Sequence, residues 1–138
     1  MGKSIVVNPK EIKPSQDFLK ERTVKFIFDC LKNNQLNLLP PQPVVRRDDQ
    51  GNLIAIDGHN LIAVYDWLDK KISVFVVEDQ DDNLRNYGQG AELRQKDFQE
   101  KFQKVTFWRE QLKKQGINSF ADLRKRYRPL FRCLETVS

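Results

Sequence analysis

The sequence predicts an α+β fold in which a small mixed β-sheet, built in the order β-α-β-β-α-β, precedes a C-terminal helical extension. In residues 1–83, short apolar stretches rich in β-branched side chains alternate with stretches of helical periodicity. An Asp-Asp-Gln-Gly turn signal joins two of these stretches as a hairpin. In residues 84–138, apolar side chains recur only at helical spacing. We therefore expect a sheet domain at 1–83 and a helical extension at 84–138 packed on it.

The first predicted strand is Ser4–Val7, and an extended lead-in follows at Ile12–Lys13 because the residue before a proline avoids the helical region. Ser15 is a plausible N-cap for a helix that reaches Asn33–Asn34. The residues expected on the inner face of this helix are Phe18, Val24, Ile27, Phe28 and Leu31.

A hairpin and a crossover complete the predicted sheet. Val44–Arg47 and Asn52–Ile56 are the hairpin strands, joined by the turn Asp48–Gly51. Helical spacing begins at His59. The apolar run Ile72–Val77 predicts a buried strand, reached by a crossover from that helix.

The second part is predicted to be two helices after a linker at Tyr87–Gly90. The first helix fits Ala91–Gln115 and ends at Gly116, and the second begins near Ser119 and ends at Pro129. An apolar stripe on the first helix is expected to pack against the sheet domain, and it consists of Phe98, Phe102, Val105, Trp108 and Leu112.

Charge is divided unevenly along the 138 residues, whose formal net charge is +5. Residues 1–83 carry eleven Lys/Arg and thirteen Asp/Glu, whereas residues 84–138 carry thirteen and six. A basic tail of this kind favours an anionic partner such as DNA or RNA. No apolar run approaches the roughly 20 residues of a membrane helix. With no signal-peptide pattern and two widely separated cysteines, interpreted as buried thiols, we expect a cytoplasmic protein without a membrane partner.

The clearest candidate site lies where the strand ending at Asp57-Gly58 gives way to the helix starting at His59. A helix begins with free N–H groups and a positive dipole end, which suit a phosphate. We therefore expect a site at this point, where His59, the only histidine of the sequence, lies beside Asn60. The alternative for His59 is a polar residue that caps its own helix or binds nearby backbone.

The order of these motifs resembles the ParB/sulfiredoxin-like domain over about residues 4–79. The resemblance rests on Gln-Pro-Val-Val-Arg-Arg, the hairpin turn, Ile-Asp-Gly-His-Asn, a helix, and Lys-Lys-Ile-Ser-Val-Phe-Val-Val. It implies a bacterial, phage or plasmid protein whose central turn holds nucleotide phosphates. The nucleotide is CTP in ParB relatives, in which additional helical regions bind DNA, and ATP in sulfiredoxins.

The resemblance also implies roles for individual residues. Leu61 stands where the family has an arginine, so the nucleotide site is expected to be weakened or altered. Gly58 stands where sulfiredoxins keep their catalytic cysteine, so that reductase chemistry is not expected. The implied nucleotide-binding residues are Gln42, Asp57, Gly58, His59 and Asn60.

Much of the charge in the tail forms acid-then-base pairs at i, i+4 spacing, which stabilise a solvated helix face. The remaining cations are dense around Tyr127 and predict contacts with a phosphate backbone, with a solvated basic surface as the alternative. These candidate nucleic-acid-binding residues are Arg109, Lys113, Arg124, Lys125, Arg128 and Arg132.

Three functions follow from these patterns. The first is nucleic-acid association with a weakened nucleotide site. The second is a non-catalytic interaction module or homodimer, with an exposed apolar patch near Phe107 and Trp108. The third is a metal-dependent nuclease that uses carboxylates such as Asp57 and Glu78, although Asp48-Asp49 is what a hairpin turn requires in any case.

Overall fold

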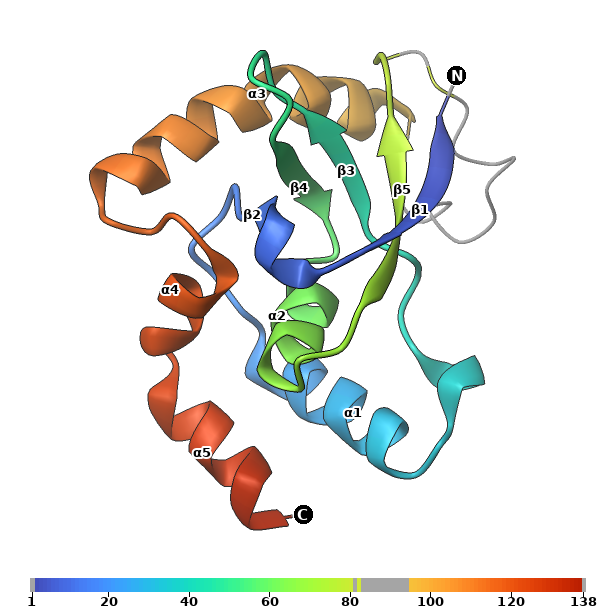
Figure 1. The fold of residues 1–138 in the computed structure, drawn as a ribbon, viewed down its shortest axis with the longest axis vertical. Coiled ribbons are helices and arrows are strands. Elements are labelled where there is room, and N and C mark those ends of the chain that lie inside the picture. The colour runs from blue at the N-terminus through green and yellow to red at the C-terminus, as the bar shows by residue number, and fades with distance from the viewer. Residues whose placement is uncertain (1, 81, 83–94, 138) are drawn as a thin grey trace.

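The computed structural model describes residues 2–80, 82 and 95–137, and among them it contains a five-stranded mixed sheet (Figure 1). The spatial order of the strands is β1-β5-β3-β4-β2. The central pair β3 and β5 runs parallel, as do β2 and β4, while β1–β5 and β3–β4 are antiparallel. The strands are β1 (Lys3–Val7), β2 (Ile12–Lys13), β3 (Val44–Arg47), β4 (Leu53–Asp57) and β5 (Ile72–Val77).

Helices cover both faces of this sheet and confirm the α+β class. Two short 3-10 turns lie at Pro9–Glu11 and Leu36–Leu38. The helices are α1 (Glu21–Lys32), α2 (His59–Trp67), α3 (Gln95–Lys114), α4 (Phe120–Lys125) and α5 (Arg128–Val137). The predicted boundary at residue 83 and the linker Tyr87–Gly90 lie outside the described residues.

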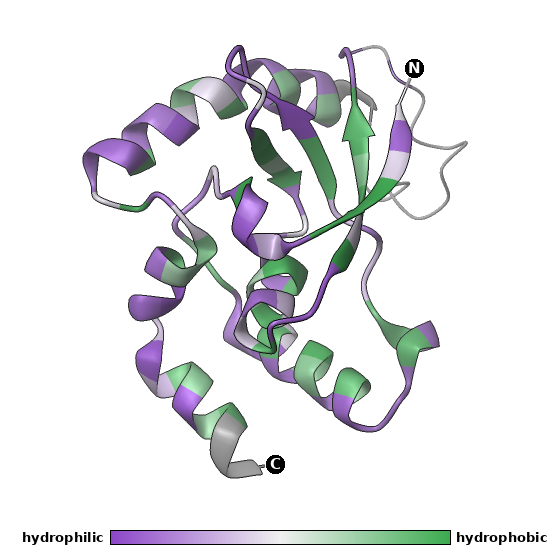
Figure 2. Ribbon diagram, viewed as in Figure 1, coloured by the Kyte–Doolittle hydropathy of each residue, from purple (hydrophilic) through white to green (hydrophobic). Residues whose placement is uncertain are grey.

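Strand β4 shows why β4 and β5 are mainly apolar. Leu53 and Ala55 belong to a core shared with α1, α2, α4 and α5, whereas Ile54 and Ile56 belong to a second core under α3. Successive side chains of a strand point to opposite faces, so a strand covered on both faces must be apolar throughout. Figure 2 shows β4 and β5 coloured mainly hydrophobic, between helices of mixed colour.

The stripe on α3 packs as predicted. Phe98 and Val105 are fully buried, and Phe102 and Trp108 pack against the same core beside Val44 and Phe75. Leu112 joins the other core. The sheet and the helical extension therefore share two cores in the described part of the chain.

Three local expectations were wrong. Ser15 does not cap α1, which begins only at Glu21, and Phe18 is 60% exposed rather than part of the inner face. By contrast, the lead-in Ile12–Lys13 is extended as predicted, and it also pairs with β4 as strand β2. Pro129 does not end a helix but lies in the first turn of α5, where its missing N–H costs nothing.

Two further observations concern membrane-spanning helices and the two cysteines. No helix among the described residues is long and apolar enough to cross a membrane. Cys30 is buried as expected, but Cys133 is exposed, and neither cysteine forms a disulfide with a described residue.

Candidate nucleic-acid interface

The turn before α2 is shaped by contact within the chain. Gly58 has a φ of 92°, which a side chain rarely adopts, and it is the N-cap of α2. A Cβ at this position would come within 2.7 Å of the Pro43 Cβ and 2.8 Å of its Cα. A glycine is therefore required here because Pro43, which precedes β3, packs closely against the turn.

His59 is a core residue. Its ring is 2% exposed and lies against Phe120, with a centroid distance of 5.6 Å. Its Nε2 accepts a hydrogen bond from the backbone N–H of Ser15 at 3.0 Å, and burial lowers its pKa from 6.5 to about 3. The structure therefore corrects the expectation of a phosphate donor: His59 is a neutral, buried acceptor, which is the alternative raised above.

Ser15 and His59 also do not form a nucleophile and its base. The Ser15 hydroxyl donates to the Ala55 carbonyl at 2.6 Å and lies 3.5 Å from Nε2. Nε2 is already the acceptor of the Ser15 amide, and both side chains are buried. A substrate could not reach a hydroxyl in this position.

The other turn residues have separate surroundings. Asn60 Oδ1 accepts from the Lys20 N–H at 2.8 Å, next to the first residue of α1. Asp57 is exposed at the end of β4. Gln42 bridges Ser73 and Ser4, with Nε2 2.8 Å and 3.2 Å from their hydroxyls.

Gln42 lines a surface hollow of about 320 Å³ that Leu61 also lines, and the lining of this hollow does not include the turn residues 57–60. Leu61 is 5% exposed and packs in the core, where the family has an arginine. Four hollows in the described part of the chain have linings that exclude Asp57, Gly58, His59 and Asn60. Within the turn, His59 and Asn60 accept hydrogen bonds from the chain's own backbone.

The six predicted nucleic-acid contacts divide into two groups. Arg109 is 5% exposed, and its guanidinium donates to the carbonyls of Pro14 and Ile117. It holds α3 against the lead-in strand, and burial lowers its pKa. Arg109 and Lys113 line a hollow of about 420 Å³ together with Asp48 and Asp49. An anion in this hollow would therefore meet two carboxylates.

The four remaining cations line one hollow of about 310 Å³, which we call the basic groove. The groove lies where α4 and α5 pass the C-terminal end of α2, the end that carries Trp67 (Figure 1). Its lining consists of Trp67, Ala121, Arg124, Lys125, Arg128, Phe131 and Arg132.

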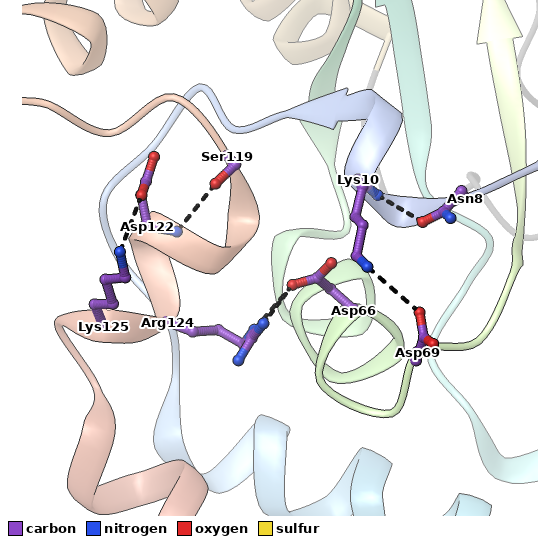
Figure 3. A network of polar contacts seen from close by, with 8 residues as sticks. All are labelled: Asn8, Lys10, Asp66, Asp69, Ser119, Asp122, Arg124 and Lys125. Atoms are coloured by element: carbon purple, nitrogen blue, oxygen red, sulfur yellow. Dashed lines mark hydrogen bonds and ion pairs between the residues drawn. The ribbon is translucent and has the colours of Figure 1, made fainter.

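Arg124 forms the base of the groove and anchors it to α2. Its NH2 and Nε donate to Asp66 Oδ2 at 2.7 and 3.0 Å, and the Asp66 side chain is only 2% exposed (Figure 3). The guanidinium carbon lies 5.2 Å from the Trp67 ring centre and 5.7 Å from that of Phe131. A cation at the C-terminal end of α2 also complements the helix dipole.

The rim carries charge that the chain leaves largely unneutralised. Lys125 lies 3.7 Å from Asp122, and its side chain is 65% exposed (Figure 3). Arg128 and Arg132 are exposed, and neither forms an ion pair with a described residue. Neighbouring Arg126 differs, because it lies 3.5 Å from Asp17. The rim thus offers three cations to an anionic partner.

The sequence analysis did not identify Trp67 and Asp66 as candidate site residues, because it described their segment only by its helical spacing. The signal was weak: an aspartate and a tryptophan at the end of an apolar helix, 57 positions before the basic run begins at Arg124. Only the packing of α4 on α2 brings them together.

Comparisons with known proteins add little to this geometry. No family model matches the chain, and no curated protein matches it. One solved structure that matches in part is the crystal structure of protein Atu1540 from Agrobacterium tumefaciens, at 14% identity and a TM-score of 0.45. The match covers 55% of this chain and 38% of that one.

Proposed function

We propose that the protein binds nucleic acid through the basic groove. The observation that carries this proposal is the convergence of Arg124, Lys125, Arg128 and Arg132 around one hollow with an aromatic floor. Cations interleaved with aromatic rings are the usual footprint of nucleic-acid contact. A merely solvating surface would not need a hollow lined by Trp67 and Phe131.

The affinity is expected to be electrostatic and modest. Three rim cations would neutralise about three phosphates, which predicts a slope of log K against log salt of roughly −2 for a single strand and −2.7 for a duplex. Arg124 contributes less because two of its nitrogens are bound to Asp66.

Fluorescence anisotropy with a labelled mixed-sequence oligonucleotide, measured across a salt series, tests the proposal. The groove variant is Arg128→Gln with Arg132→Gln. The matched control is Lys113→Gln with Lys114→Gln, which removes the same charge from exposed positions on α3. We expect the groove variant to lose about tenfold in affinity near 0.1 M salt and about 1.4 units of slope.

Two results would overturn the proposal. One is a wild-type protein that binds neither single-stranded nor duplex oligonucleotides at low salt. The other is an equal loss in the groove variant and the control, which would mean that net charge alone drives the binding.

We retain the kinship with ParB and sulfiredoxin domains as a proposal, based on the Gln42-Pro43 entry to β3 and on the Asp57–Asn60 turn. From this kinship we propose only that the C-terminal helices associate with nucleic acid. The bonds of His59 and Asn60 to the chain's own backbone argue against CTP or ATP at the turn. Calorimetric titration of the wild type with each nucleotide should give no binding heat. A saturable heat would contradict this expectation and support a nucleotide site at the turn.

A second candidate function is self-association through Phe107, whose side chain is 63% exposed beside a hollow of about 420 Å³. The same hollow is lined by Asp48 and Asp49 and by Lys113, so two copies related by a twofold axis could pair opposite charges. Light scattering should then give twice the 16.3 kDa chain mass, and Phe107→Ser should return the monomer. A monomeric wild type at high concentration would rule this function out.

A further inference from the structure

We propose that the basic groove receives an unpaired nucleobase, so that its ligand is single-stranded nucleic acid rather than duplex. This inference rests on the proposed function and specifies its substrate. It follows from the floor of the groove, whereas the proposed function follows from the charge of its rim.

The floor is a set of flat groups held in fixed positions. The Trp67 ring is partly buried and lies 5.5 Å, at 56°, from the ring of Phe131, which is 2% exposed and supports it from the core. The Arg124 guanidinium lies near both rings. Two hydrogen bonds to the buried Asp66 carboxylate fix the plane of that guanidinium. Aromatic rings and arginine planes are the surfaces on which proteins stack unpaired bases.

A duplex cannot use such a floor. Its bases are paired and stacked on each other, so that only phosphates, sugars and base edges are exposed. The groove volume of about 310 Å³ is at the lower limit of ligand pockets, which fits one flat heterocycle and not a double helix.

The rim is placed to hold the phosphates on either side of such a base. Arg128 and Arg132 are one helical turn apart on α5, a rise of about 6 Å. Lys125 belongs to the preceding helix α4 and lines the same groove. A strand that lays one base on the floor would therefore meet cations on both helices.

An acidic peptide is the competing occupant, because it would also satisfy the rim. Carboxylate side chains, however, offer nothing planar and uncharged to place against Trp67 and Phe131. The aromatic floor therefore favours the nucleobase, and the peptide becomes an arm of the experiment.

The chain contains two tryptophans, Trp67 and Trp108, which allows a direct optical test. In the Trp108→Phe variant, Trp67 is the only indole, and a stacked base should quench its emission. In the matched Trp67→Phe variant, Trp108 reports from the core beneath α3, on the other face of the sheet. Each variant is titrated with a single strand, its duplex, an abasic strand of equal length and an oligoglutamate.

We expect the single strand to bind roughly tenfold more tightly than the duplex or the abasic strand at equal salt, as stacking of one base predicts. Quenching should occur in the Trp108→Phe variant with the single strand alone, and Trp67→Phe should bind the single strand more weakly without quenching. Thermal unfolding of both variants confirms that they fold.

The failure of this inference differs from that of the proposed function. Duplex or abasic binding equal to single-strand binding, with no quenching of Trp67, overturns the single-strand inference and leaves nucleic-acid association standing. Oligoglutamate that binds as tightly as the single strand and quenches Trp67 equally also overturns the inference, because the binding then does not depend on a nucleobase. Absence of all oligonucleotide binding overturns both.

Discussion

The two ends of helix α2 show opposite uses of polar residues. At its N-terminal end, His59 and Asn60 accept hydrogen bonds from the backbone of Ser15 and Lys20. At its C-terminal end, Asp66 binds Arg124, while Arg128 and Arg132 beyond them stay exposed. A cluster of polar residues at a helix end is therefore not by itself a ligand site, because the chain's own segments can occupy it. The groove differs because its cations outnumber the carboxylates that the fold brings to them.

The largest effect is expected where the groove is anchored. Arg124→Ala should lower the free energy of unfolding by about 3 kcal/mol, because it leaves the Asp66 carboxylate buried without its partner. Urea unfolding measures this loss. Lys125→Ala, in the adjacent exposed position, should cost no more than about 0.5 kcal/mol.

A double variant sharpens the same prediction. Arg124→Met with Asp66→Leu removes both charges and should recover much of the stability lost in Arg124→Ala, since an unpaired buried charge is the main cost. If the double variant is no more stable than the single one, packing of the guanidinium on Trp67 and Phe131, and not the ion pair, holds the groove together.

An effect of similar size is expected at the turn before α2. Gly58→Ala should cost about 3 kcal/mol, because a left-handed backbone strains any side chain and the new Cβ would overlap Pro43. Gly51→Ala is the matched control, since Gly51 also has a positive φ of 83° but has open space around it. The control should cost about 1 kcal/mol, and equal losses would mean that contact with Pro43 is unimportant.

Burial of the His59 imidazole predicts that the wild type and a His59 variant differ in how their free energy of unfolding depends on pH. The pKa of His59 falls from 6.5 to about 3 on folding, so the unfolded chain binds the extra proton between these values. Stability contributed by neutral His59 is complete above pH 6.5 and is lost as the pH falls toward 3. Between pH 8 and pH 5 the wild type should lose about 2 kcal/mol more than His59→Gln, as measured by urea unfolding. Parallel pH profiles would show that the ring is protonated in the folded protein.

The smallest effect on stability is expected at the groove rim. Arg128→Gln with Arg132→Gln should change the free energy of unfolding by less than about 0.5 kcal/mol, because both side chains are exposed and unpaired among the described residues. Thermal unfolding checks this directly. A larger loss would assign the two arginines a role in the fold and weaken their assignment to binding.

Local signals were sufficient to predict most of the sheet. Strands β3, β4 and β5 lie within one residue of their expected bounds, because apolar runs and the turn Asp48–Gly51 specify them locally. In that turn, Asp48 Oδ1 accepts from the backbone of Gln50 and Asn52, both at 2.9 Å. The short strand β2 was missed because only its partner β4 makes it a strand.

The residues of the proposed site were predicted less well than the sheet, because local sequence does not show which arginines are buried by packing. Arg109 and Arg128 are both arginines in a basic tail, and nothing local distinguishes them. Arg109 is directed at two backbone carbonyls by the packing of α3, whereas Arg128 is left at the surface. Trp67 entered the groove only because α4 and α5 pack beside the end of α2.

The sequence alone determined the class of fold, the hairpin, the apolar stripe of α3 and the basic character of the tail. These features depend on neighbours within a few residues, where periodicity and turn chemistry act. The tertiary structure decided that His59 is buried, that Arg109 is structural and that four cations meet Trp67 at one groove. Whether a polar side chain binds its own chain or remains free for a partner depends on segments dozens of residues away, and only folding brings those segments into contact.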